Sequence, residues 1–297
     1  MRNTAIEKLD VNETAFFLRE LEFIKARSFD VLKAPLTARE LFPISYEADP
    51  GATAITYSSY DTVGMAKVVA NYADDLPIAE VKGVQNTQLV RELGAAYQYN
   101  IKEIRKSQMS GKGLEQRKAN AAVRAIEMTL NKLAFHGGEG VQGFLNNNNI
   151  PVASGHDWDT ATPAEIYADM QLGVTSIIDN SNGVHTPNEI WLPAGRYAKV
   201  MSERMAEGTD TTIGQFAQMN LNVTIKQCPN LKGTGAGDTD RMVICENNGD
   251  NFTLEIPAEL DFLPPQERNL SYIINGLLST GGVIVYYPMA AMFIDGL

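Results

Sequence analysis

The stretch YEADPGATAITYSSYDTVGMAKVVANYADDLPIAEVK (residues 46–82) carries the main clue to the fold. Small, polar and β-branched residues alternate along it, without the dense apolar face of a strand pair inside a compact core. This pattern predicts a long two-stranded arm. Because a lone β-hairpin is only marginally stable in water, we expect the arm to pack against another copy of the chain.

Length and composition bound the class of protein. A chain of 297 residues predicts one large domain or two ordinary ones. A hydrophobic content of 44% and a charged content of 21% are typical of soluble globular proteins. No stretch approaches the roughly 18 apolar residues of a membrane span, and the N-terminus lacks the apolar core of a signal peptide. We therefore expect no membrane contact and a location in a cytoplasm.

The net charge of -11 argues against a protein that binds nucleic acid by adhesion. Neutralising phosphates requires clustered Lys and Arg, and the charge favours mutual repulsion between free copies. If the chain handles DNA, we expect enclosure. The two thiols, Cys228 and Cys245, are too few for a disulfide framework and are predicted to be buried residues in neighbouring strands.

A long helix is predicted over residues 112–136. The run LEQRKANAAVRAIEMTLNKLAFH contains no proline, is rich in strong helix formers and stops at Gly137 and Gly138. One face of it carries Ala122, Ile126, Leu130 and Leu133. A helix of about 24 residues is roughly 36 Å long. Its length makes it the predicted spine of the fold.

A second helix is predicted to begin after Thr162, the N-cap residue. Pro163 takes the first position and Glu165 completes a capping box. The apolar stripe of this helix comprises Ile166, Met170, Val174 and Ile177.

The N-terminal part predicts a helix that opens near Asp10, where DVNE offers a capping box. An extended, irregular strap is predicted from FDVLKAPLTARELFPIS (29–45). Between the arm and the spine, alternation over residues 95–101 predicts a strand, although a helix there is an open alternative.

The second half of the chain predicts an α/β arrangement. The predicted helices are GRYAKVMSERMAEG (195–208) and residues 211–219. The predicted strands are EIWLP (189–193), LNVTIKQCP (221–229), RMVICENN (241–248), NFTLEIP (251–257) and much of residues 270–297.

This order of parts resembles the tailed-bacteriophage major capsid proteins with the Hong Kong ninety-seven-like fold, a fold shared with encapsulin nanocompartments. The resemblance covers the N-terminal arm, the LTARELFPIS strap, the extended loop, the spine helix, the GVQGFLNNNNIP turn and the apolar end VIVYYPMAAMFIDGL. It implies an α+β fold. The implied parts are an N-terminal arm and helix (1–45), an extended β-hairpin loop (46–82), a peripheral domain (83–161 and 263–297) and an axial α/β domain (162–262).

The resemblance also implies a function. The chain would self-assemble into pentamers and hexamers of an icosahedral shell that encloses phage double-stranded DNA without specific binding, inside a bacterial host. The implied partners are a portal, a separate scaffolding protein, because no fused scaffold precedes the first helix, and decoration proteins. The arm residues expected to contact the neighbouring copy are Ile55, Tyr57, Tyr60, Val63, Met65, Lys67 and Val69. Deletion of residues 53–72 is expected to leave a folded subunit that cannot close shells.

Lys67 is the arm residue with a further implied role. Some relatives join their subunits by a Lys to Asn isopeptide bond, and Lys67 is the only lysine in the arm proper. A solvated or salt-bridged Lys67 is the favoured reading.

The enzyme alternative rests on two features. The histidines, His136, His156 and His185, lack metal-ligand spacing, and HDWD (156–159) is predicted to be an exposed polar turn. KGTGAGD (232–238) precedes a strand, so a flexible hairpin loop is favoured over a phosphate loop. Neither feature supports a catalytic, cofactor or metal residue, and Tyr286 and Tyr287 are predicted to pack in the core or an interface. An α+β enzyme with a dimerisation arm and a nanocompartment shell remain the alternatives to a phage capsid.

Overall fold

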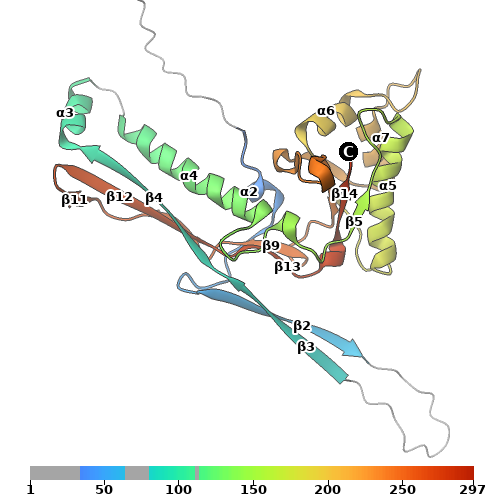
Figure 1. Cartoon of the computed structure of the whole chain (residues 1–297), viewed down its shortest axis with the longest axis horizontal. Helices are drawn as coiled ribbons and strands as arrows, with labels where there is room; N and C mark the ends of the chain where they lie inside the picture. Colours follow the sequence, from blue (N-terminus) through green and yellow to red (C-terminus); the bar gives the residue numbers. More distant parts are fainter. Residues whose placement is uncertain (1–33, 64–79, 111–113) are drawn as a thin grey trace, which may run out of the picture. The chain divides into compact units, whose positions relative to one another are not determined.

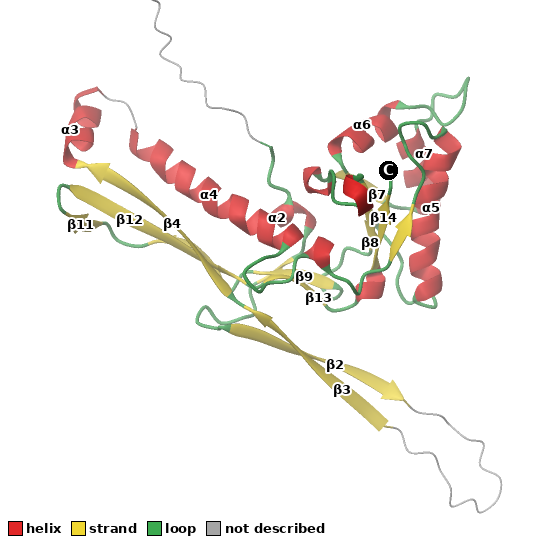
Figure 2. Ribbon diagram, in the orientation of Figure 1, coloured by secondary structure: helices red, strands yellow, loops and turns green. Residues whose placement is uncertain are grey.

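The computed structural model describes residues 34–63, 80–110 and 114–297. The chain divides into Met1–Ala34 and the unit Pro35–Leu297, which holds the elements shown in Figures 1 and 2. The predicted helix near Asp10 lies outside the described residues. In the described part, no helix combines the length and the apolar character that crossing a bilayer requires.

The spine helix is confirmed as α4 (Leu114–His136), which contacts the strands β4 and β12 (Figure 1). Its predicted face is buried: Leu130 is fully enclosed, and Ile126 is 2% exposed. Gly137 ends the helix with φ of +67°, a left-handed conformation that costs glycine little.

The sheet beside α4 is antiparallel. β12 (Ser271–Thr280) pairs along its whole length with β4 (Arg91–Asn100). β10 (Ala258–Phe262) and β11 (Gln266–Arg268) pair with the other edge of β12. For residues 95–101 the sequence predicted a strand and left a helix as an alternative. The structure contains a strand followed directly by a helix: β4 ends at Asn100, and α3 (Ile101–Ser110) begins at the next residue.

The predicted strap is only partly extended. Its described part contains the short helix α2 (Ala38–Leu41) and the strand β1 (Ile44–Ser45). The helical turn forms because Asn131 Oδ1 of the spine accepts hydrogen bonds from the N–H groups of Thr37 (3.1 Å) and Ala38 (3.0 Å). β1 then opens a three-stranded sheet with β9 (Phe252–Glu255) and β13 (Gly282–Val285), in the order β1-β9-β13.

A five-stranded sheet forms the rest of the fold, in the order β5-β14-β8-β6-β7. Its strands are β5 (Val152–Ser154), β14 (Ala291–Asp295), β8 (Arg241–Cys245), β6 (Glu189–Leu192) and β7 (Thr224–Gln227). The accompanying helices are α5 (Pro163–Asn180), α6 (Ala194–Ser202) and α7 (Ile213–Leu221). The predicted domain boundaries stay a prediction. The last strand, β14, was assigned to the peripheral part (263–297), but it pairs with β8 and so shares a sheet with strands of the predicted axial part (162–262).

This sheet separates two hydrophobic cores. In β8, Val243 and Cys245 belong to the core that includes Phe144 and Trp191, whereas Met242 and Ile244 belong to the core beneath α5. Successive side chains of a strand point to opposite faces, so a strand buried on both faces reads as a continuous apolar run. This explains the runs RMVIC and AMFID.

Three expectations about this half of the chain were wrong in detail. The segment 195–208 is helical only to Ser202, after which the backbone of Glu203 is extended. Cys228 and Cys245 are both buried, as predicted, but β6 lies between β7 and β8, so their strands are not neighbours. For the same reason KGTGAGD is no hairpin loop, since it connects two strands separated by a third.

The predicted capping box of α5 is present. Thr162 N–H donates to Glu165 Oε2 (2.8 Å), and Thr162 Oγ1 accepts from Glu165 N–H (3.5 Å). The stripe that follows is buried, with Ile166 and Met170 fully enclosed.

Loss of this cap should cost the protein modest stability. We expect Thr162→Ala to lower the free energy of unfolding by about 1 kcal/mol, because the Glu165 N–H loses its acceptor and the Glu165 carboxylate loses the hydroxyl donor. Thr175→Ala is the matched control, since Thr175 is exposed in the middle of the same helix. Thermal melts of both variants check the prediction, and equal melting temperatures would contradict it.

Candidate assembly interface

The predicted arm is a β-hairpin (Figure 2). β2 (Ala54–Val63) pairs with β3 (Glu80–Leu89) in antiparallel register, from Ala54 opposite Leu89 to Val63 opposite Glu80. The predicted end at residue 82 was wrong, because the second strand continues through GVQNTQL to Leu89.

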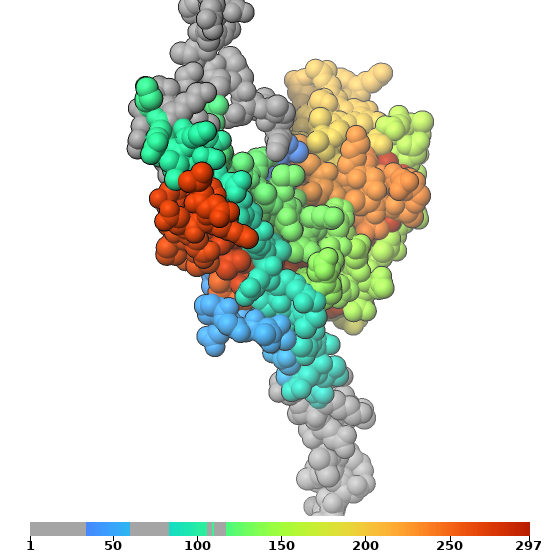
Figure 3. All heavy atoms as spheres, turned by 60° about the vertical axis from the view of Figure 1, so that its left-hand side comes forward, coloured from blue at the N-terminus to red at the C-terminus, as the bar shows by residue number. Residues whose placement is uncertain are grey.

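The described part of the hairpin is open to solvent. Figure 3 shows the teal part of the chain, which begins at residue 83, at the molecular surface. Residues 83–87 are all exposed, and Val84 is 60% exposed. Thr56 and Thr87 share a hydrogen bond of 3.0 Å between their hydroxyl groups across the strands. Within the described residues β2 and β3 pair only with each other, so each strand keeps one unpaired edge. Such edges are ready sites for pairing with another chain.

Tyr57 holds the base of the hairpin to its own subunit. Its ring lies edge-on to that of Tyr286, with 5.0 Å between centroids, and its hydroxyl donates to the carbonyl of Val285 (3.4 Å). Burial raises the pKa of the Tyr57 hydroxyl, which stays protonated and able to donate.

Two further contacts fix the same base. Gln88 Nε2 donates to the carbonyl of Gly281 (3.1 Å), and the N–H of Val90 donates to the carbonyl of Thr53 (2.9 Å). These contacts hold both strands of the hairpin, at its base, beside β13.

A buried polar group lies beneath this base. The Glu255 carboxylate is 3% exposed and accepts hydrogen bonds from Thr253 Oγ1 (2.7 Å) and Tyr286 Oη (3.2 Å). Burial raises the pKa of Tyr286. Tyr286 thus links the hairpin to the β9 strand through one ring and one hydroxyl, in agreement with its predicted packing role.

The predicted contact residues of the arm fall into three sets. Ile55 and Tyr57 lie at the base, where Ile55 approaches Gly281 and Tyr57 contacts Tyr286. Tyr60 and Val63 lie in the far half of β2. Met65, Lys67 and Val69 lie outside the described residues.

Gln88 and Tyr286 hold the base of the hairpin, and sequence reasoning assigned neither of them a role in the arm. The β-branched Val84 and Thr87 within an uncharged run were the available signal for the longer strand. No local signal pointed to the contact between residues 57 and 286.

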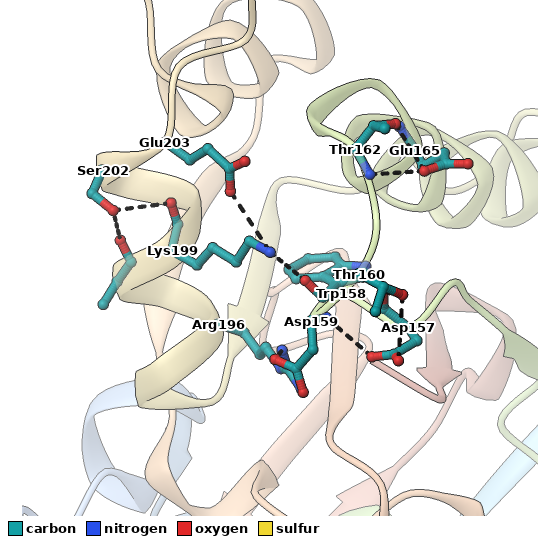
Figure 4. Close-up of polar contacts among 11 residues, drawn as sticks. Asp157, Trp158, Asp159, Thr160, Thr162, Glu165, Arg196, Lys199, Ser202 and Glu203 are labelled. Carbon is teal, nitrogen blue, oxygen red and sulfur yellow. Dashed lines mark hydrogen bonds and ion pairs between the residues drawn. The ribbon is translucent and has the colours of Figure 1, made fainter.

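The HDWD turn is built into the fold. Figure 4 shows Asp159 facing Arg196 and the Lys199 ammonium group reaching the Trp158 carbonyl. Arg196 also donates to Asp240 Oδ2 (3.2 Å). The hydrogen bond from Arg196 to Asp159 lowers the pKa of the Asp159 carboxyl. Asp159 therefore ties the turn to α6, whereas the Asp157 carboxylate accepts from the Asp159 N–H (3.0 Å) within the turn.

His156 closes the turn against α5. Its Nδ1 lies 2.7 Å from Oδ1 of the buried Asp169, whose Oδ2 accepts from Trp158 Nε1 (2.8 Å). Among the described residues no group of three or more His, Cys, Asp or Glu side chains is arranged to hold a metal ion.

The His156 contact predicts a pH dependence of stability. The hydrogen bond to Asp169 raises the pKa of His156 above its ordinary 6.5. A histidine whose pKa is higher in the folded than in the unfolded protein stabilises the fold while it is protonated. This stabilisation is complete below the unfolded-state pKa and is lost as the pH rises through the folded-state pKa. We expect the melting temperature of the wild type, relative to His156→Gln, to be highest in mild acid and to converge on that of the variant in alkali.

His136 provides a contrast within the same chain. Burial lowers its pKa, so its contribution is present above the unfolded pKa and is lost as the pH falls. The wild type relative to His136→Gln should show the opposite trend, and parallel trends for the two variants would refute the assignment.

Comparisons with known proteins bear on the whole chain. A family model described as "Major capsid protein" matches residues 64–297. No curated protein matches.

Solved structures share the fold at low sequence identity. The capsid of Myoviridae phage XM1 superposes with a TM-score of 0.82 at 18% identity, covering 94% of this chain and 98% of that one. Mycobacterium phage Ogopogo gives a TM-score of 0.65 at 13% identity, covering 95% of this chain and 98% of that one. A virus-like particle from Pyrococcus furiosus gives 0.58 at 12% identity, covering 89% and 92%.

At such identities the structures show the fold alone, and the family model carries the assignment. Its description, "Major capsid protein", does not favour a nanocompartment shell. With residues 64–297 matched, the chain belongs to the major capsid protein family and is a structural protein of a capsid shell.

Proposed function

We propose that copies of this chain form the pentamers and hexamers of an icosahedral shell that encloses phage double-stranded DNA. The observation that carries the proposal is the hairpin, which is exposed over residues 83–87 and whose strands pair with no described strand other than each other. Lying across an adjacent copy would give those edges hydrogen-bonding partners.

The fixed base divides the arm into two roles. Ile55 and Tyr57 set the direction in which the arm leaves its own subunit. Tyr60, Val63, Met65, Lys67 and Val69 are the residues that contact the neighbour.

Closure follows from repeating one heterologous contact whose rotation returns to the starting subunit. Each contact need only be modest, because a subunit held by several neighbours gains from multivalency. In this arrangement 162–262 is the axial part that gathers around the ring centre, and 83–161 with 263–297 is the peripheral part.

The shell contains DNA without binding it specifically. The net charge of -11 opposes adhesion to phosphates. We infer a purely structural role without catalysis, supported by the way Asp159 and His156 of the HDWD turn are engaged with Arg196 of α6 and Asp169 of α5.

Assembly in the cytoplasm of a bacterial host requires further proteins. A separate scaffolding protein sets the shell size, a portal occupies one vertex, and decoration proteins bind outside.

The test is assembly of the purified chain with and without its scaffolding protein, followed by sedimentation and negative-stain microscopy. We expect closed shells that sediment far faster than any ring of subunits. Monomers or small rings under all conditions would overturn the proposal.

A further inference from the structure

A polar cavity of about 270 Å³ lies at the base of the hairpin, beside β13. β3 and the loop that follows the spine helix line it together with β13. Its polar lining residues are Asn86, Thr87, Gln88, Gln142, Asn147 and Asn149. No charged residue lines it, in a chain that is 21% charged. We call this cavity the amide slot.

The side-chain amides of the amide slot are available for a ligand. In the part of the chain that the structure describes, those of Asn86, Gln142 and Asn149 make no hydrogen bond to the protein, and all three residues are exposed. A carboxamide both donates and accepts, as a peptide group does. Three of them, one from β3 and two from the loop after the spine helix, match the hydrogen-bonding capacity of a polypeptide backbone.

The strand at the floor of the slot has an open edge. β13 pairs with β9 on one side and with no described strand on the other. On that open side the carbonyls of Gly281 and Val285 accept from side chains, Gln88 and Tyr57. Because backbone groups alternate between the two edges of a strand, Val283 presents its N–H and carbonyl to the same side as Val285. A short extended segment could pair there.

The neutral lining selects the kind of segment. A charged segment would lose hydration in the slot without gaining an opposite charge, whereas an uncharged one loses little. The stretches 54–60 and 83–89 of the hairpin contain no charged residue. Both belong to strands with an unpaired edge.

We propose that the amide slot receives an uncharged edge of the hairpin from a second copy of this chain, which adds a strand to β13. This assignment rests on the proposed function, because it supplies the receiving site for the arm. β13 is 4 residues long, so the slot takes about four residues of the incoming strand, about 13 Å. The contact is heterologous: the hairpin of one copy enters at the hairpin base of the next.

Disulfide trapping in assembled shells tests the assignment. Asn149→Cys places a thiol in the slot, and Ser58→Cys or Ser59→Cys places one on either face of the ribbon, since neighbouring strand residues point to opposite faces. The native thiols should not interfere, because burial raises the pKa of Cys228 to about 11 and raises that of Cys245 well above its usual range.

We expect mild oxidation of the shells to yield covalent ladders for one of the two pairs. The matched control combines the same hairpin cysteines with Gln171→Cys, an exposed position on α5, and should yield no ladder. Shells that form but give no ladder with either pair would overturn the slot while leaving the shell function intact. Absence of shells from the wild type would instead overturn the shell function, on which the slot depends.

A charge series adds a second measurement. Gln142→Glu combined with Asn149→Asp keeps the shape of the slot but adds two carboxylates and removes two donors. We expect an unchanged melting temperature and about a tenfold rise in the concentration needed for assembly, since an unmatched buried polar group opposes the contact. Gln171→Glu should assemble as the wild type does. Normal assembly of the double variant would count against the slot.

Discussion

Replacing residues 59–84 by an Asn-Gly turn should yield a folded subunit that cannot close shells. Ser58 lies opposite Gln85 in the hairpin, so a two-residue turn can join them without strain. The shortened hairpin keeps Tyr57 and Gln88, which hold its base to β13. Its circular dichroism and melting temperature should therefore stay close to those of the wild type.

The expected loss is in assembly. The shortened hairpin lacks Tyr60, Val63 and the distal arm and keeps only residues 54–58 and 85–89 of the uncharged edges, so each subunit gives up most of the contact with its neighbour. We expect the concentration needed for assembly to rise by at least about 100-fold, equivalent to about 2.7 kcal/mol per contact. Sedimentation and particle counts by microscopy measure it. Shells of normal size and yield would show that the arm is dispensable.

The structure changes the design of this deletion. The sequence favoured removing residues 53–72, but this would take away β2 to its last residue while leaving β3 without a partner. An unpaired, uncharged strand such as 83–89 is an aggregation hazard. Aggregation would then be confused with failure to assemble, whereas trimming both strands at one register pair avoids the problem.

Local signals explain what could be predicted. The cap of α5 lies within four consecutive residues, 162–165, and its start was predicted correctly. The spine helix was predictable because its helix formers, apolar face and terminal glycines all agree over 114–138.

What the sequence left open or misjudged depends on partners far along the chain. A strand was predicted at Ala95 and Tyr97 with a helix left open, because the choice is decided by β12, where Gly276 and Ile274 lie opposite them. The loop 232–238 was misread because β6, from an earlier part of the chain, lies between the strands that it connects. No spacing in the sequence reports such an insertion.

The amide slot shows the same limit at the candidate site. Asn86 belongs to β3, whereas Gln142 and Asn149 belong to the loop after the spine helix, and each alone is an ordinary exposed amide. Their meeting beside β13 depends on Gly282, which adopts φ of +70° beside Val141 of the loop after the spine. The three amides lie together only in the folded chain, so the sequence alone does not reveal the slot.

Leu130→Asp should abolish folding. Leu130 is fully buried in the C-terminal part of the spine helix, in the core shared with Phe42 and Phe144. The change removes a large apolar side chain and places an unpaired carboxylate where no described partner of opposite charge belongs to the core. A loss of more than about 4 kcal/mol is expected, which is a large share of the stability of a typical domain.

Met128→Asp is the matched control, two residues away on the same helix. Met128 is 46% exposed, so a carboxylate there stays hydrated and should change the free energy of unfolding by less than about 1 kcal/mol. Circular dichroism and soluble yield separate the two variants. If Leu130→Asp melted cooperatively near the wild-type temperature, the spine helix would not be the element around which the fold is built, and the fixed base that aims the hairpin would need another support.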